Sequence, residues 1–146
     1  MKFKFSLESV FRVRKHQEKL QKQKLAEELS KKKEIDTLRK RVQGRLENYL
    51  DNEQGTGAEN IHQIRRRGKH VEEVHHLMNK LGDKLQEVEF SVDRERENLA
   101  EAHKRRHIME KMKEFEQASF VEKIIKNEQK NMDEIATQTF SLWKNG

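Results

Sequence analysis

The chain has 146 residues, of which 40% are charged and 32% hydrophobic, and it contains six glycines, no proline and no cysteine. Globular domains contain about 45–50% apolar and about 25% charged residues, so this chain has too few apolar side chains to fill a compact core. Strand-rich folds need glycine or proline at their reversals, which excludes hairpins and sandwiches. Long helices or disorder remain.

Disorder is the alternative that a highly charged composition with few aromatic residues favours. Two features argue against it. The 32 Lys and Arg residues are nearly balanced by 26 Asp and Glu residues, so self-repulsion is modest. The apolar residues also recur at intervals of three and four, as they do on one face of a packed helix. We therefore expect an all-α protein.

The absence of cysteine excludes disulfide frameworks, thiolate catalysis and cysteine-based metal sites. No apolar run reaches the 18 residues or so that a membrane-spanning helix needs, and the N-terminal sequence lacks the apolar segment of a signal peptide. We therefore expect a cytoplasmic protein.

The first expected helix covers about residues 6–51. Ser6 is placed to cap its first turn, and Phe5 and Val10 have the spacing of a hydrophobic staple. Steps of three and four residues then predict the face that packs. The predicted face consists of Leu25, Leu29, Lys32, Ile35, Leu38, Val42, Leu46 and Tyr49.

A turn-like segment follows, because Gly55 and Gly57 stand close behind an Asp-Asn pair. It predicts a loop over about residues 52–57. Thr56 and Glu59 have the spacing of a capping box, so a second helix is expected over about residues 58–143.

The second helix carries a stripe that alternates strictly between steps of three and four for more than four heptads, which is typical of a coiled-coil seam. Beyond this stripe the pattern is expected to shift phase through Ile108, Met112 and Phe115. The stripe consists of Val71, Val74, Met78, Leu81, Leu85, Val88, Val92, Glu95, Leu99 and Ala102.

Two long helices joined by a short loop pack antiparallel. We therefore predict that residues 1–146 form one long antiparallel two-helix coiled coil, an α-hairpin. The helices would differ in length, about 68 Å against about 130 Å at 1.5 Å per residue. The second helix must either overhang the first or fold back near a second capping box, Ser119 with Glu122. No turn-like sequence stands there, which favours an overhanging second helix that needs a partner for its apolar side chains.

Signals for enzymatic chemistry are nearly absent. No glycine-rich phosphate loop is present. His103 and His107 have a metal-ligand spacing, but Lys104, Arg105 and Arg106 stand between them and would repel a cation. We therefore expect no catalytic residues, no metal site and no cofactor.

The charge is unevenly distributed, since residues 1–50 contain 15 Lys and Arg against 7 Asp and Glu. Basic runs at residues 31–33, 39–41 and 65–67 could contact nucleic-acid phosphates. However, no aromatic platform for stacking bases accompanies them, and basic runs are commonly solvated helix faces. An acidic protein is at least as good a candidate partner as a nucleic acid.

Both ends of the chain resemble the flagellar export protein FliJ family. The opening segment, residues 3–15, has alternating aromatic residues, a Leu-Glu pair, an apolar pair and a basic stretch, followed by Glu18 and a Leu-Ala pair at residues 25–26. The closing segment contains residues 122–125, a Glu-Gln pair at 128–129, an Asp-Glu-x-Ala core at residues 133–136 and Phe140. The run Arg65-Arg66-Arg67 departs from the family pattern.

The resemblance implies a small cytoplasmic component of the bacterial flagellar type III export apparatus, at the base of the flagellum. Such a protein has no enzymatic activity and folds as an antiparallel coiled coil similar to the stalk of rotary ATPases. The family implies insertion into the hexameric export ATPase, with promotion of ring assembly, and contacts with a membrane export gate protein and with export chaperones. The membrane would be contacted only through these partners.

The same resemblance implies two partner-binding regions. The gate region, near the loop, would contain Leu46, Tyr49 and Leu50, for which packing within the seam is the alternative role. The ATPase region would contain Leu7, Val10, Phe11, Arg12, Arg14, Asp133, Glu134 and Phe140.

Two other functions stay open from the sequence. One is a generic structural coiled-coil scaffold, and the other is a basic coiled-coil protein that binds nucleic acid. Stimulation of a partner ATPase would argue against the first, and the absence of salt-dependent binding to DNA or RNA would argue against the second.

Overall fold

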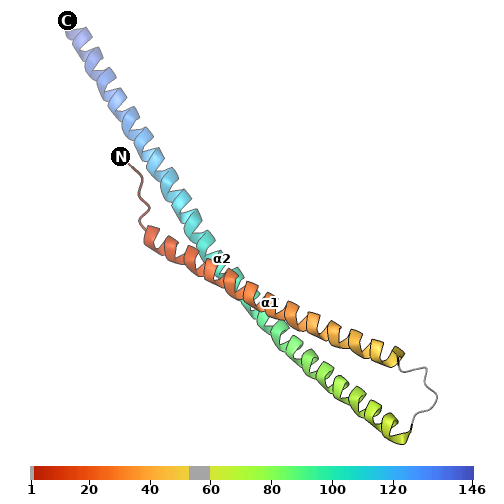
Figure 1. Cartoon of the computed structure of the whole chain (residues 1–146). Coiled ribbons are helices and arrows are strands. Elements are labelled where there is room, and N and C mark those ends of the chain that lie inside the picture. The colour runs from red at the N-terminus through yellow and green to blue at the C-terminus, as the bar shows by residue number, and fades with distance from the viewer. Residues whose placement is uncertain (1, 53–59) are drawn as a thin grey trace. The chain divides into compact units, whose positions relative to one another are not determined.

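A computed structural model describes residues 2–52 and 60–146, and its secondary structure over these residues is two long helices without a strand. Helix α1 spans Glu8–Asn52 and helix α2 spans Ile61–Asn145 (Figure 1). The helices pack against each other, which confirms the expected all-α fold. The contacts divide the chain into two compact units: Met1–Glu18 with Glu101–Gly146 form unit 1, and Lys19–Ala100 form unit 2.

In unit 2 the two helices run antiparallel. Lys32 Nζ lies 3.8 Å from Glu89 Oε1, and the rings of Tyr49 and His70 are 4.8 Å apart between centroids. Residue numbers therefore rise along α1 as they fall along α2. This is the arrangement expected for two helices that bury their apolar faces against each other.

The seam of α2 in unit 2 lies where the sequence predicts it. Val92 is 2% exposed and Leu81 5% exposed, and Glu95 occupies the polar place in the stripe. The prediction is confirmed for the whole stripe, because its remaining members are half-buried between exposed neighbours. These members are Val71, Val74, Met78, Leu85, Val88 and Leu99 in unit 2, and Ala102 in unit 1.

The predicted face of α1 is wrong at two positions. Leu29 and Leu38 are exposed, whereas Glu28 and Arg39 are half-buried in their places. The seam of α1 follows a single heptad phase. Each exposed leucine stands one residue away from a seam position. Long polar side chains can fill such positions by lying along the partner helix, and the Arg39 guanidinium passes over Gly82, where an added Cβ would lie 3.7 Å from Nη2.

Unit 1 is also antiparallel. Glu8 Oε2 lies 3.2 Å from Lys113 Nζ, and the rings of Phe3 and Phe120 are 5.5 Å apart between centroids. The extended segment before α1 thus continues along α2 as far as Phe120.

The apolar core of unit 1 is an aromatic cluster. It lies where a helix cap and a hydrophobic staple were expected. Phe5 and Phe11 are buried with Met109, and the two rings meet edge to face with centroids 6.3 Å apart. Ser6 does not act as predicted, because its hydroxyl donates a hydrogen bond of 2.8 Å to Glu116 Oε1. The expected staple is also wrong, because Phe5 packs into the cluster whereas Val10 is exposed.

The seam of α2 continues into unit 1 without the expected phase shift. Ile108, Met112 and Phe115 are exposed, and Phe115 is 77% exposed. The buried and half-buried positions instead extend the heptad phase of unit 2. They are Arg106, Met109, Lys113, Glu116 and Phe120. The expected shift is wrong because charged side chains occupy three of these positions. The heptad pattern therefore cannot be followed there from the apolar residues alone.

Helix α2 begins at Ile61, where the Asn60 side chain caps it. Asn60 Oδ1 accepts a hydrogen bond of 2.9 Å from the amide of Gln63. The expected capping box, Thr56 with Glu59, lies outside the described residues, as do Gly55 and Gly57. At its other end α2 runs through Ser119 and Glu122 without a break.

Candidate partner-binding surfaces

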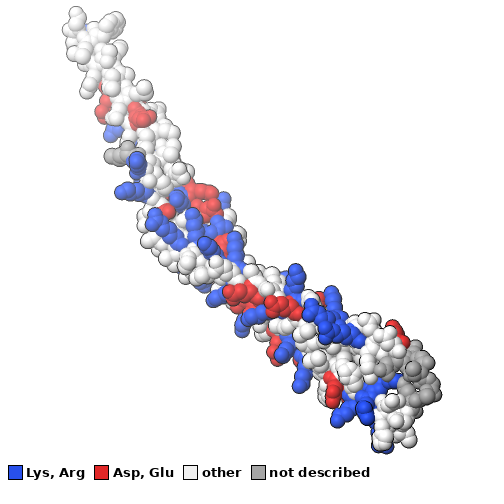
Figure 2. Space-filling model, in the orientation of Figure 1, with Lys and Arg blue, Asp and Glu red and all other residues white. Residues whose placement is uncertain are grey.

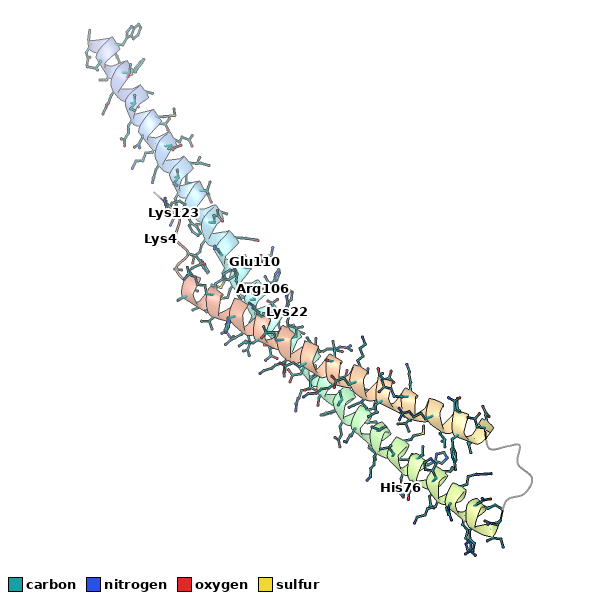
Figure 3. All side chains as sticks on the ribbon, in the orientation of Figure 1. Lys4, Lys22, His76, Arg106, Glu110 and Lys123 are labelled. Carbon is teal, nitrogen blue, oxygen red and sulfur yellow. The ribbon has the colours of Figure 1, made fainter. Side chains whose placement is uncertain are left out.

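An ion pair between a buried carboxylate and a half-buried arginine lies in the seam of unit 1. Glu18 is 5% exposed, and its Oε2 accepts a hydrogen bond from Arg106 Nε. Arg106 Nη1 also donates a hydrogen bond of 2.7 Å to Glu110 Oε2, one turn further along α2 (Figure 3). The hydrogen bond to Glu18 raises the pKa of Arg106 despite the opposing effect of burial. The pair therefore fixes a charged contact inside the seam.

His103 completes this group. Its Nδ1 lies 3.2 Å from Arg106 Nη2 and 3.5 Å from Glu18 Oε1, and its ring stacks with that of His107 at a centroid distance of 6.1 Å. Among residues 2–52 and 60–146, no group of three or more histidine or carboxylate side chains is arranged to hold a metal ion.

Beyond Phe120, α2 has an apolar face that no part of α1 covers. All residues from 125 onward are exposed, and Trp143 is 78% exposed. The apolar residues lie on one side of the helix, because the spacings between them are close to whole numbers of helical turns. They are Val121, Ile125, Met132, Ile135, Leu142 and Trp143. The last turns of α2 also show few charged side chains (Figure 2).

A shallow cleft of about 320 Å³ adjoins this face in unit 1. Phe3 and Phe120 form part of its wall together with the exposed Phe115. Lys4 and Lys123 also line it, and they lie near each other in Figure 3. The cleft thus joins aromatic surface to two cations, with no buried polar group that would select a small ligand.

The model of the family described as "Flagellar FliJ protein" matches residues 3–144, which is nearly the whole chain. The chain belongs to the flagellar FliJ family. Membership makes it a component of the flagellar export apparatus. No curated protein and no solved structure matches the chain. Over the residues that the structure describes, neither helix is long and apolar enough to cross a membrane.

The structure separates the ATPase region that the FliJ resemblance implies into two parts. Leu7 and Phe11 pack in the aromatic cluster of unit 1, opposite Met109 of α2. Asp133 and Phe140 lie 24 and 31 residues beyond Met109, about 36 and about 46 Å along the helix axis. The two parts therefore do not form one continuous surface.

Exposure differs among the residues of the first part. Phe11 is buried, with Lys15 Nζ 4.2 Å from its ring centroid, whereas Val10 and Arg12 are exposed. Arg14 is half-buried and donates a hydrogen bond of 3.3 Å to Gln17 Oε1.

In the second part every predicted residue is exposed. Asp133, Glu134 and Phe140 all lie on the uncovered part of α2. The ring of Phe140 lies 6.4 Å from that of Trp143 between centroids. Asp133 and Phe140 share a face, seven residues apart.

The residues of the gate region that the resemblance implies lie in unit 2. Leu46 is buried in the seam, Tyr49 is half-buried against His70, and Leu50 is exposed. Leu46 thus packs within the seam, and Tyr49 and Leu50 present most of the surface of this region.

Sequence reasoning missed the Glu18–Arg106 pair, although a signal for it exists. Steps of four and three residues back from Leu25 lead to Gln21 and Glu18. A step of four from Ala102 leads to Arg106. Following the heptad phase through polar residues, rather than following hydrophobicity, would have placed both charges in the seam.

Proposed function

We propose that this FliJ family member is a non-enzymatic coiled coil that inserts the uncovered C-terminal part of α2 into the hexameric flagellar export ATPase. The observation that carries the proposal is the apolar face from Val121 to Trp143, which α1 leaves in water. Monomeric proteins rarely expose contiguous apolar surface of this kind unless another molecule covers it.

The geometry supports a binding mode in which a helix enters an apolar channel or groove. Anchors on one helix face are the usual contacts in such complexes, and exposed aromatic residues contribute most to their affinity. Phe140 and Trp143 meet this description, and Asp133 and Glu134 add charge that could fix orientation.

The gate region would provide a second contact. Tyr49 and Leu50 lie toward the other end of α1, and we propose that they contact the membrane export gate protein. Export chaperones would bind at further surfaces of the chain. The protein would act in the cytoplasm at the base of the flagellum, as the family implies.

The test is to titrate the full chain into the flagellar export ATPase and to measure ATP hydrolysis and hexamer formation. We expect the full chain to hydrolyse no ATP alone and to raise both quantities in the partner. The variant Leu142→Ser with Trp143→Ser should lose most of this effect, since truncating an aromatic anchor commonly costs 2 kcal/mol or more of binding, roughly a 30-fold loss of affinity.

Gln138→Ser is the matched control, because Gln138 is exposed on the same part of α2 and is polar. It should stimulate as the unchanged chain does. No change in hydrolysis or hexamer formation with the unchanged chain would contradict the proposal and favour a generic scaffold.

A further inference from the structure

The first turns of α2 carry an unusual set of charges. Residues 61–71 contain Arg65, Arg66, Arg67 and Lys69 and no Asp or Glu. The N-terminus of a helix is the positive end of its dipole, where cations are unfavourable and carboxylates are favourable. The first turn of α2 has no carboxylate, and Arg65 and Lys69 stand four residues apart, a spacing at which like charges destabilise a helix. The stability of α2 therefore does not explain the presence of these cations.

Apolar side chains lie on the same turns and are not covered. Ile61 is 67% exposed and Ile64 55% exposed. Together with Arg65 and Gly68 they occupy positions i, i+3, i+4 and i+7, which share one helix face. A Cβ added at Gly68 would have no atom within 4 Å, so no described side chain packs on this face.

The cations beside this face are exposed to solvent. Arg65, Arg66 and Lys69 are exposed, and none of them forms an ion pair with another described residue. Arg67 is half-buried toward the seam and is left out of the surface. Lys and Arg side chains are visible over the beginning of α2 in Figure 2. The α2-start surface is defined by Ile61, Ile64, Arg65, Arg66 and Lys69.

We infer that the α2-start surface binds the anionic face of a lipid bilayer. At a bilayer surface, isoleucine side chains can enter the boundary between headgroups and acyl chains while guanidinium and ammonium groups contact lipid phosphates. A nucleic acid would use the cations but would leave both isoleucines in water. The combination of exposed isoleucines with cations that form no ion pair among the described residues therefore favours lipid.

This inference goes beyond the proposed function, in which the membrane is reached only through protein partners. A direct lipid contact would hold this family member at the membrane surface independently of the ATPase. Its strength would be modest and salt-dependent, because two isoleucines and three cations are few for stable anchoring.

The test is co-sedimentation of the full chain with vesicles of phosphatidylcholine alone and with vesicles in which one third of the lipid is phosphatidylglycerol. We expect binding to the anionic vesicles only, and weaker binding at high salt. Each cation removed should weaken binding by about fivefold, the fold-change that corresponds to about 1 kcal/mol per Lys or Arg near an anionic surface. Arg65→Gln, Arg66→Gln and Lys69→Gln together should therefore abolish detectable binding.

A matched control removes three exposed cations elsewhere on α2, through Arg96→Gln, Arg105→Gln and Lys126→Gln. It has the same net charge as the first variant and should keep most of the vesicle binding. Equal loss in both variants would overturn the inference, because it would show attraction by total charge. A separate variant, Ile61→Ser with Ile64→Ser, should weaken vesicle binding at every salt concentration.

Two further outcomes would overturn the inference. One is the absence of binding to anionic vesicles by the unchanged chain. The other is salt-dependent binding of DNA or RNA that requires Arg65, Arg66 and Lys69, with vesicle binding unaffected by their loss. Circular dichroism would verify that each variant stays helical. Stimulation of the ATPase would be measured in parallel, so that failure of the lipid contact and failure of the proposed function are seen separately.

Discussion

At the residue scale, the Glu18–Arg106 pair shows how a coiled coil can place charge inside its seam. Two charges taken out of water lose hydration, and their attraction offsets this loss only when hydrogen bonds satisfy them. Arg106 donates to both Glu18 and Glu110, so it keeps two carboxylate partners. A single charged pair in a seam can fix the register of two helices, which is the best-attested use of such a group.

Removing one member of this pair should cost stability. We expect Glu18→Gln to lower the free energy of unfolding by about 2 kcal/mol, less than for a fully buried pair because Arg106 is partly exposed. Glu18→Leu with Arg106→Leu should restore most of it, since the two leucines can pack in the seam. Urea unfolding of both variants measures this. A double variant as unstable as the single one would contradict the explanation.

The raised pKa of Arg106 also has a consequence for pH dependence. A cation whose pKa is higher in the folded state contributes its stability fully below the unfolded pKa and loses it only as the pH rises through the folded value. For arginine both values lie far above neutrality. Arg106 itself therefore contributes no change in stability between pH 6 and pH 9.

At the element scale, the seam of α2 could be predicted from the sequence and that of α1 only in part. Valine, leucine and methionine hold most of the α2 seam from residue 71 to 102, so hydrophobicity and heptad phase agree there. In α1, Glu28, Lys32 and Arg39 hold seam positions while Leu29 and Leu38 stand beside them. Hydrophobicity then points to the wrong residues, because position in the seam is set by helix geometry and not by residue type.

The candidate surfaces were predictable to a different degree. The uncovered end of α2 follows from the unequal helix lengths, which the loop position fixes in the sequence. The burial of Phe11 does not follow, because it depends on the segment before α1, residues 2–7, which packs its aromatic rings against α2. Contacts of that kind join residues over 100 positions apart, and no local pattern encodes them.

Glu95 offers a test of the energetics of this seam. One of its carboxylate oxygens is buried and has no hydrogen-bond partner among the described residues. Glu95 stands between Val92 and Leu99 in the seam. A buried polar atom without a partner costs about 1–3 kcal/mol. We therefore expect Glu95→Leu to raise the free energy of unfolding by about 1–2 kcal/mol, measured by urea unfolding.

Glu97→Leu is the control for this change, because Glu97 is exposed on the same helix. It should change the free energy of unfolding by less than about 0.5 kcal/mol. An equal gain from both substitutions would show that leucine acts through helix propensity and not through burial in the seam.

At the scale of the whole molecule, residues that stabilise the fold and residues that are available to a partner occupy different stretches of α2. Up to Phe120, α2 contacts the N-terminal segment through Glu116 and Lys113 as well as through the aromatic rings. From residue 125 onward every side chain is exposed. Stability and partner binding should therefore be separable by truncation, which is the strongest consequence of the unequal helices.

Two truncated chains test this separation. A chain ending at Lys126 is shortened only by residues that are exposed in the full chain, so its unfolding midpoint in urea should stay close to that of the full chain. Its stimulation of the export ATPase should be lost. A chain ending at Lys111 also lacks Lys113, Glu116 and Phe120, the partners of Glu8, Ser6 and Phe3. Its midpoint should fall, because Phe3, Ser6 and Glu8 lose these contacts with α2 and Phe3 becomes more exposed to water. Equal midpoints for the two truncated chains would show that the contacts of the N-terminal segment add nothing to stability.

Full ATPase stimulation by the chain ending at Lys126 would place the partner surface elsewhere, with the exposed stripe at Ile108, Met112 and Phe115 as the next surface to test.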